Sequence, residues 1–125
     1  MKQVTRNITP ESAYDLLERV PRACIAFDVG ARPQVQPVTL HWRPPHYLIG
    51  VPQSAIDQPG PDQEIVLLVD EGIYYFQLRA IYIRGTVQPA QPASGDSAGL
   101  TWFELTPSKT IAWDYGTMHE VADEH

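Results

Sequence analysis

After residue 22 the sequence reads as a succession of short β-strands with no second helical segment between them. The predicted strands, separated by turn residues, span residues 23–29, 34–42, 46–51, 64–70, 73–87, 100–106 and 110–115. Because no helix alternates with these strands, a parallel βαβ arrangement is excluded. The pattern predicts a mainly β protein of about seven antiparallel strands, folded as a barrel.

One amphipathic helix is expected before the strands. Thr9 is a favourable N-cap, and Pro10 suits the first helical position, where its missing N–H costs nothing. An apolar stripe follows at helical spacing, formed by Ala13, Leu16, Leu17 and Val20, and Pro21 ends the segment. We expect a short helix that caps the core.

Three strands carry unusual patterns. In 34–42 the apolar phase shifts by one residue at Pro37, which predicts a bulge or bend because proline cannot donate to the ladder. The segment 73–87 is long and is expected to bend, with Gly85 as a bulge or a point of close approach. The segment 64–70 is continuously apolar between two acids, which predicts a strand buried on both faces.

Length and charge exclude several classes of protein. The chain has 125 residues, enough for a single domain over 1–125, and 43% of them are hydrophobic, which argues against general disorder. The net charge is −6 and the nine bases are scattered, so nucleic acid and anionic membrane surfaces are poor partners. Residues 88–99 and the polar tail from Gly116 are expected to be irregular.

The compartment is inferred from what the sequence lacks. The N-terminus has no apolar core of the signal-peptide kind, and no apolar stretch approaches the length of a membrane span. The single cysteine, Cys24, lies in an apolar run and is expected to be a small buried side chain. A cytoplasmic protein is the expectation.

Local catalytic and metal motifs are lacking. The glycines do not have phosphate-cradling spacing, and the histidines of the acidic tail do not have metal-ligand spacing. We therefore predict no catalytic acid, base or nucleophile and no metal site. His41 and His46 straddle a double-proline turn, and either converge across a hairpin or are ordinary strand-end residues.

Two further sets of side chains have alternative interpretations. Arg79 and Arg84 lie in an apolar strand, where each either holds an anion such as a phosphate or forms a salt bridge at a rim or interface. Their odd separation places them on opposite sides of a regular strand. Three tryptophans either build a flat wall for a ring system or fill the core and an interface: Trp42, Trp102 and Trp113.

The order of these segments resembles a known family. Its elements are LLERVPRACIAFDVGARP, VQPVTLHW, HYLIGVP, IVLLVDEG, IYIRGTV and WFELTPSKTIAWDYG. Over residues 9–115 this order is similar to the pyridoxamine 5′-phosphate oxidase-like split β-barrels, flavin-binding proteins that dimerise and hold the cofactor at the interface. The resemblance implies a split barrel, a homodimer, FMN or the deazaflavin F420 as cofactor, and hydride transfer to or from a small-molecule substrate.

The resemblance also implies which residues contact the cofactor. The strand with the internal proline passes the flavin ring, and the end of the next strand lines it; these positions are Gln36, Pro37, Val38 and Thr39, then Val51, Pro52, Gln53 and Ser54. Family members grip the phosphate with a nearby Lys or Arg, but this chain has no base from residue 51 to residue 77, which leaves Arg79 and Arg84 as the nearest candidates. The missing bases favour, as an alternative, a non-catalytic split barrel that binds haem or unphosphorylated flavin, or a dimeric interaction module.

Overall fold

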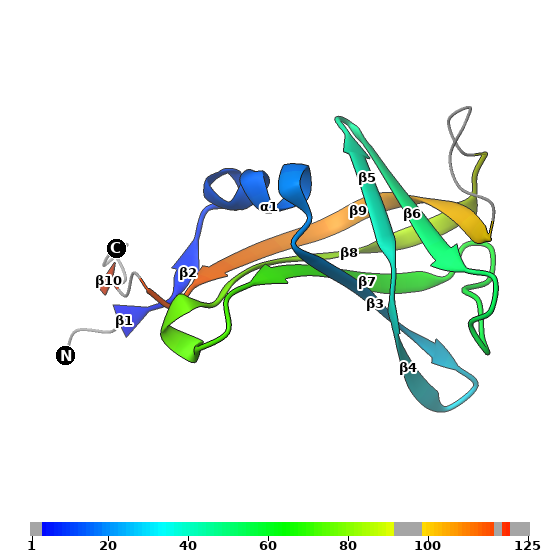
Figure 1. Ribbon diagram of the computed structural model, residues 1–125, viewed down its shortest axis with the longest axis horizontal. Coiled ribbons are helices and arrows are strands. Elements are labelled where there is room, and N and C mark those ends of the chain that lie inside the picture. Colours follow the sequence, from blue (N-terminus) through cyan, green and yellow to red (C-terminus); the bar gives the residue numbers. More distant parts are fainter. Residues whose placement is uncertain (1–3, 92–98, 117–118, 121–125) are drawn as a thin grey trace.

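The computed structural model describes residues 4–91, 99–116 and 119–120 of the chain. Its main sheet is antiparallel and curls into a half-barrel, in the strand order β4-β3-β7-β8-β9-β6-β5, with β2 added beside β9 (Figure 1). The strands are β2 (Asn7–Ile8), β3 (Arg22–Val29), β4 (Arg32–Pro37), β5 (Thr39–Arg43), β6 (His46–Pro52), β7 (Glu64–Glu71), β8 (Arg79–Pro89) and β9 (Leu100–Asp114). A separate two-stranded sheet pairs β1 (Val4–Thr5) with β10 (His119–Glu120). The predicted mainly β split barrel with one N-terminal helix is confirmed.

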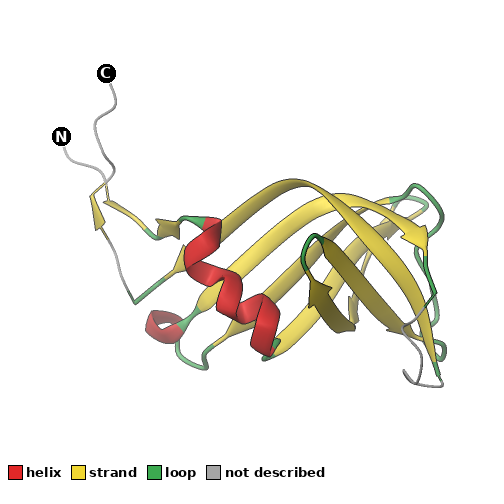
Figure 2. Ribbon diagram, turned by 90° about the horizontal axis from the view of Figure 1, so that it is seen from above, coloured by secondary structure: helices red, strands yellow, loops and turns green. Residues whose placement is uncertain are grey.

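The helix lies where the sequence pattern predicts it. A 3₁₀ turn, η1 (Pro10–Ala13), leads into α1 (Tyr14–Arg19), and Val20 ends the helix in the left-handed conformation with φ of 45°. Figure 2 shows this helix lying across the strands. The apolar stripe packs against the inner face of the sheet, where Ala13, Leu16 and Leu17 are buried with residues of β3, β7 and β8.

The break predicted at Pro37 is a change of pairing partner. Up to Pro37 the chain pairs with β3, and from Thr39 it pairs with β6. Val38 lies between the two strands and donates its N–H to the carbonyl of Ala23 at 3.1 Å. Because β4 and β5 are the two ends of the strand order, this crossover joins the two edges of the curled sheet.

Two predicted strand boundaries are wrong. The segment 73–87 does not begin as a strand, because the chain turns between β7 and β8 through a short 3₁₀ helix, η2 (Tyr75–Gln77). The last two predicted strands are one, β9, whose register against β8 shifts at Arg84/Gly85. The bulge lies at Pro107–Ser108 and accommodates the proline, which has no N–H to donate, so the pairing of β8 with β9 continues beyond it. A Cβ on Gly85 would lie 2.1 Å from the carbonyl oxygen of Thr106, which confirms the predicted close approach.

Burial on both faces was predicted for β7, and the structure confirms it for one face. Ile65, Leu67 and Val69 are buried in the core, as predicted. The alternate residues Val66 and Leu68 are only half-buried, because no element of the described chain covers the outer face of the sheet. We define the outer face as the side of the sheet opposite α1. Its half-buried apolar residues are Cys24, Ala26, Val66, Leu68, Ala80, Tyr82, Ile111 and Trp113. Irregular structure was expected for residues 88–99 and for the tail from Gly116, but Gln88 and Pro89 belong to β8 and His119–Glu120 forms β10. Residues 92–98, 117–118 and 121–125 lie outside the described residues.

Candidate functional site

The two strand segments that the resemblance identifies lie side by side. Thr39 pairs with Gly50, so the crossover Gln36–Thr39 ends beside Val51–Ser54, the segment in which β6 ends after Pro52. Val51 points into the core and is fully buried, whereas the side chains of Gln53 and Ser54 are exposed. We call these two adjoining segments the junction.

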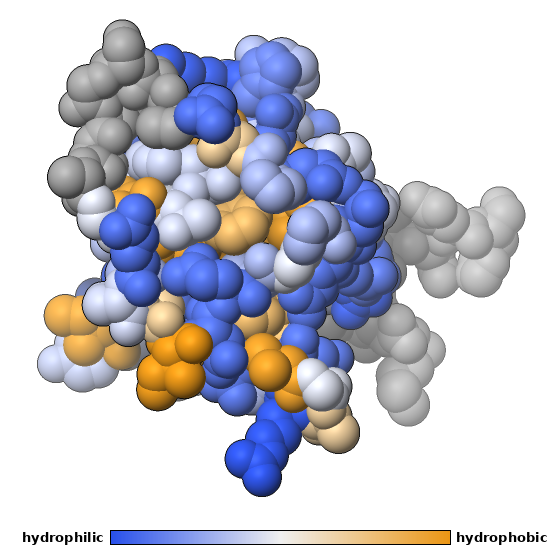
Figure 3. Space-filling view, turned by 90° about the vertical axis from the view of Figure 1, so that its right-hand side faces the viewer, coloured by the Kyte–Doolittle hydropathy of each residue, from blue (hydrophilic) through white to orange (hydrophobic). Residues whose placement is uncertain are grey.

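A hollow of about 170 Å³ opens on one side of the junction. It lies between β4 and the loop that follows β6, and its lining is Phe27, Gln34, Val35, Gln36, Ile56 and Asp57. Two apolar side chains on its rim are unusually exposed, Val35 at 69% and Ile56 at 97%. Figure 3 shows apolar side chains gathered low on this side of the molecule, toward the β3–β4 hairpin. Exposed apolar groups beside a hollow are typical of a surface that a ligand or partner covers.

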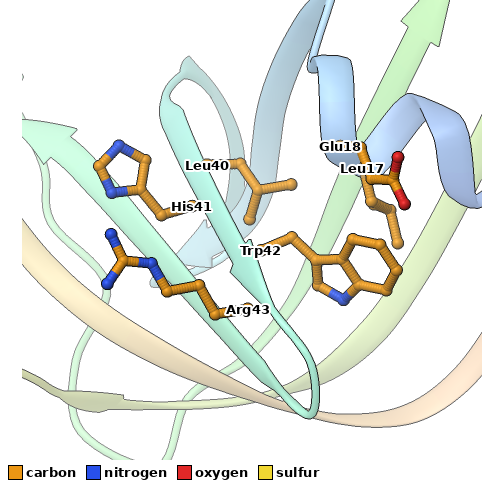
Figure 4. Close-up of a pocket in the computed structure, with 6 residues that line it drawn as sticks. All are labelled: Leu17, Glu18, Leu40, His41, Trp42 and Arg43. Carbon is orange, nitrogen blue, oxygen red and sulfur yellow. The ribbon is translucent and has the colours of Figure 1, made fainter.

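A larger hollow of about 450 Å³ opens on the other side of the junction. Val38 and Thr39 line it together with the end of α1 and the start of β3, including Arg19 and Arg22. It continues into a hollow of about 230 Å³ between α1 and β5. Figure 4 shows Leu40 and Trp42 pointing toward the helix, with His41 and Arg43 on the opposite side of β5.

Two buried polar atoms flank the junction without a partner. In the described part of the chain, the indole N–H of Trp102 and the amide oxygen Oε1 of Gln58 are the buried side-chain polar atoms that lack a hydrogen bond. Trp102 is 4% exposed and pairs with Gly50 across β6 and β9. Gln58 donates its Nε2 to the carbonyl of Pro52 at 2.9 Å. Because buried polar groups are nearly always satisfied, these atoms mark places where a ligand or water completes the bonding.

Gly50 makes room for the indole of Trp102. A Cβ at position 50 would lie 3.1 Å from Cη2 of Trp102, so a side chain there would push the ring away. The indole also lies beside His41, whose ring centroid is 5.0 Å from that of Trp102. Sequence reasoning missed this arrangement; its only local signal is a glycine inside an otherwise apolar strand, which often marks a close approach.

Arg79 lies away from the junction and is engaged by the protein's own carboxylates. Its guanidinium donates to Asp15 at 2.8 and 2.9 Å and to the carbonyl of Ser12 at 3.0 Å. Glu71 and Asp114 lie at 3.5 and 3.7 Å. These bonds, with that of Arg19, hold the pKa of Asp15 well below its usual range. Arg79 therefore joins the helix to the sheet.

Arg84 lies on the opposite side of β8, as the odd spacing predicts. It is exposed, with Nε 3.5 Å from Oε1 of Glu64 and its guanidinium carbon 5.8 Å from the ring centre of Tyr82. The structure thus brings the two junction segments together and separates both arginines from them.

The remaining candidates also separate. His46 bonds Glu104 at 2.7 Å, whereas His41 contacts Trp102, so the two histidines do not converge. Trp42 packs near Tyr14 at a centroid distance of 5.3 Å, and Trp113 meets Tyr82 on the outer face at 6.1 Å. The three tryptophans therefore do not form one wall.

Comparison with known proteins identifies the fold. No protein-family model and no curated protein sequence matches this chain. Solved structures do: an FAD binding protein from Mycobacterium smegmatis matches with a TM-score of 0.67 and 12% identity, over 93% of this chain and 99% of that one.

Two further structures have the same fold. A candidate pyridoxamine 5′-phosphate oxidase from Listeria innocua gives a TM-score of 0.62 at 11% identity, over 84% of this chain and 96% of that one. An FAD and heme binding protein from M. smegmatis gives 0.64 at 12% identity, over 86% of this chain and 72% of that one. The chain therefore has the split-barrel fold that is found in these flavin-binding and pyridoxamine 5′-phosphate oxidase-like proteins.

Proposed function

We propose that this protein is a flavin-dependent oxidoreductase that holds the flavin ring at the junction and transfers hydride to or from a small-molecule substrate. FMN and F420 are the cofactors that the family resemblance implies. The observation that carries the proposal is the coincidence of the two expected segments with flanking hollows and two unsatisfied buried polar atoms. A bound flavin supplies the hydride chemistry itself, so no catalytic acid or base is required of the chain.

The residues at the junction suit the ring of a flavin. Pro37 and Val38 offer apolar surface, and the amide of Gln36 adds a polar group that can contact the ring edge. Beside the hollows, the buried N–H of Trp102 is an unused donor and the buried Oε1 of Gln58 an unused acceptor, the two bonding types that the edge of a flavin ring requires. The chain's contribution is to orient the ring and exclude water around it.

The same residues do not suit a phosphate. A phosphate dianion needs charge-assisted donors to offset its desolvation, and the loop after β6 supplies Asp57 instead of a base. Ser54 and backbone N–H groups are the remaining donors there. The fit is therefore to the ring and not to the phosphate.

The protein is proposed to act as a homodimer through the outer face. Apolar residues from β3, β7, β8 and β9 lie half-buried there, and a hollow of about 190 Å³ between Leu68, Ala80 and Trp113 leaves room for a partner's side chain. Contiguous exposed apolar surface of this kind is uncommon on monomers. A second copy of the chain would complete the burial that the apolar sequence of β7 indicates.

The proposal extends to the compartment. Cytoplasmic placement is proposed from the sequence, whose single cysteine, Cys24, offers no pair for an intrachain disulfide. In the described part of the chain, no helix is both long enough and apolar enough to cross a bilayer.

A second candidate function is a non-catalytic binder of another planar ligand, such as haem or unphosphorylated flavin, or a dimeric interaction module. The absence of bases around the loop after β6 favours it over a phosphate-dependent enzyme. One protein of the same fold is described as binding both FAD and heme.

Spectroscopy of the purified protein tests the two candidates. We expect a flavin absorption band, or, for colourless protein, saturable binding when FMN, F420 and riboflavin are titrated separately. Reduction of the bound flavin by a small-molecule donor would support the oxidoreductase. Binding of haem with no flavin binding would replace it with the second candidate.

A further inference from the structure

We propose that the junction selects an uncharged flavin, of the riboflavin type, over its phosphorylated forms. The inference rests on the proposed flavin-binding function and adds the class of cofactor. Two features of the described chain carry it: the acceptors of the loop after β6, and the carboxylate partners of the arginines that line the larger hollow.

The loop after β6 presents hydrogen-bond acceptors. Asp57 lines the smaller hollow and has no ion-pair partner among the described residues. The next residue, Gln58, uses its Nε2 on the carbonyl of Pro52, which leaves Oε1 buried and without a donor. Two adjacent side chains therefore need donors from a ligand or from water.

A phosphate and a ribityl chain differ in what they bring to such a loop. A phosphate oxygen is an acceptor and carries negative charge, so it meets Asp57 and Gln58 with the wrong bonding type and the wrong sign. The ring N–H and the inner ribityl hydroxyls are donors in riboflavin and FMN alike, but at the end of the chain riboflavin has a neutral hydroxyl donor where FMN has the phosphate. The loop therefore matches an uncharged flavin and opposes a phosphorylated one.

The arginines that line the larger hollow are already paired. Arg19 bonds both Asp15 and Glu71, at 2.8 and 2.6 Å. Arg22 lies 3.3 Å from Asp70 and donates to the carbonyl of Gly72 at 2.6 Å. The charge of each guanidinium is already offset by a carboxylate of the fold, so a phosphate that recruited it would gain less than it would from an unpaired arginine.

The two arginines of β8 are not available to a phosphate at the junction either. Arg79 is held between three carboxylates at the helix, and Arg84 is exposed on the opposite side of the strand beside Glu64. Neither lines the hollows at the junction. Among the described residues, no base lines the smaller hollow, whereas Arg43, which forms no ion pair there, lines the hollow of about 230 Å³ between α1 and β5.

The rim of the smaller hollow suits the flavin ring itself. Val35 and Ile56 expose apolar surface to solvent at its edge. A flavin ring that covers them removes this surface from water, and it does so equally in riboflavin and FMN.

Titration of the full-length protein with riboflavin and with FMN, followed by flavin fluorescence at low salt, tests the inference. We expect riboflavin to bind at least about tenfold more tightly than FMN. Added salt should reduce the difference between the riboflavin and FMN affinities, because it screens the repulsion between Asp57 and the phosphate.

Two matched variants locate the effect. Asp57→Asn removes one negative charge at the smaller hollow with little change of shape. It should reduce the ratio of riboflavin affinity to FMN affinity by about two- to fivefold. Glu11→Gln removes one negative charge on the exposed 3₁₀ turn before α1 and should leave the ratio unchanged. Thermal unfolding checks that both variants are folded.

The outcomes separate this inference from the function on which it rests. FMN binding as tightly as riboflavin, or more tightly, overturns the inference and leaves the flavin-binding function intact. An equal change of the ratio in both variants shows that general charge, and not the loop, sets the preference, and also overturns it. Failure of riboflavin and FMN to bind overturns the inference, and failure of F420 to bind as well removes the proposed cofactor-binding function.

Discussion

The two faces of strand β7 are both apolar, yet the chain buries them to different extents. Leu67 points inward and is fully buried beneath α1, whereas its neighbour Leu68 points outward and is only half-buried. The same alternation continues in β8, where Ile81 and Ile83 are buried and Tyr82 is not. The sheet therefore has one face closed by its own helix and another that remains to be covered.

This difference separates two roles for similar residues. On the inner face an apolar side chain stabilises the fold of the single chain, since it is already removed from water. On the outer face the same type of side chain contributes chiefly when a second copy is present. Substitutions at adjacent positions can therefore distinguish folding from association.

The largest effect is expected for Leu67→Ala. Truncation of a fully buried leucine leaves a cavity in the core, and should lower the free energy of unfolding by about 2–5 kcal/mol. Denaturant unfolding of the parent and of the variant at equal concentrations measures the change. A loss smaller than that of Leu68→Ala would contradict the assignment of the inner face as the core.

Leu68→Asp is expected to act on association. A charge on the outer face would be buried without a partner in the dimer, and should weaken self-association by about 100-fold or more, equivalent to about 2.7 kcal/mol. Sedimentation velocity over a dilution series measures this shift. Gln91→Glu, a new charge at an exposed position, serves as the control. Unchanged association of Leu68→Asp would exclude the outer face as the interface.

A smaller effect is expected where polar groups join the helix to the inner face. Arg79→Met removes the bonds to Asp15, whose side chain is 42% exposed, so the expected loss of stability is about 1 kcal/mol after allowance for solvent screening. Urea unfolding near neutral pH measures it. The charge-conserving variant Arg79→Lys should recover part of the loss, and full stability of Arg79→Met would contradict the role of Arg79 at the helix.

The same contact predicts a dependence on pH. Arg79 and then Arg19 lower the pKa of Asp15, so this carboxylate stabilises the folded state above the pKa it has when unfolded, about 4. Its contribution is lost as the pH falls from about 4 toward the lowered value. Arg79→Met should therefore lose less stability than the parent between about pH 4 and pH 2. Parallel curves of stability against pH for the parent and for Arg79→Met would show that Asp15 does not cause the loss of stability in acid.

The smallest effect is expected for Trp102→Phe, which keeps an aromatic ring and removes the unpaired N–H. Stability should change by about 1 kcal/mol or less, because the lost donor makes no bond among the described residues. Flavin affinity should fall about three- to tenfold if that N–H bonds the ligand. Isothermal titration with riboflavin measures it, and unchanged affinity would remove Trp102 from the site.

Much of the fold follows from local pattern. The stripe through Leu16 and Leu17 predicts the helix and the face that it buries, and the missing N–H of Pro37 predicts where the strand must break. Gly85 is predictable because only a residue without Cβ tolerates the approach of Thr106. These signals depend on a residue and its near neighbours.

The errors arise where pairing between distant segments decides the outcome. Pro107 reads as a turn, but β8 holds both halves of β9 in one ladder and a bulge absorbs the proline. The aromatic residues after Gly72 read as a strand, but the pairing of Glu71 with Arg79 requires a turn there. Trp102 at the junction depends on Gly50 of another strand, and no local pattern contains that contact.

The most direct test of this account is sedimentation of the riboflavin-loaded protein, detected in the visible absorption band of the flavin. The account predicts that the flavin sediments with a species of twice the 14.0 kDa chain mass, because the outer face joins two copies and each holds a ring at its junction. Flavin that sediments with a single chain would contradict the dimer, and flavin that remains unbound would contradict the site.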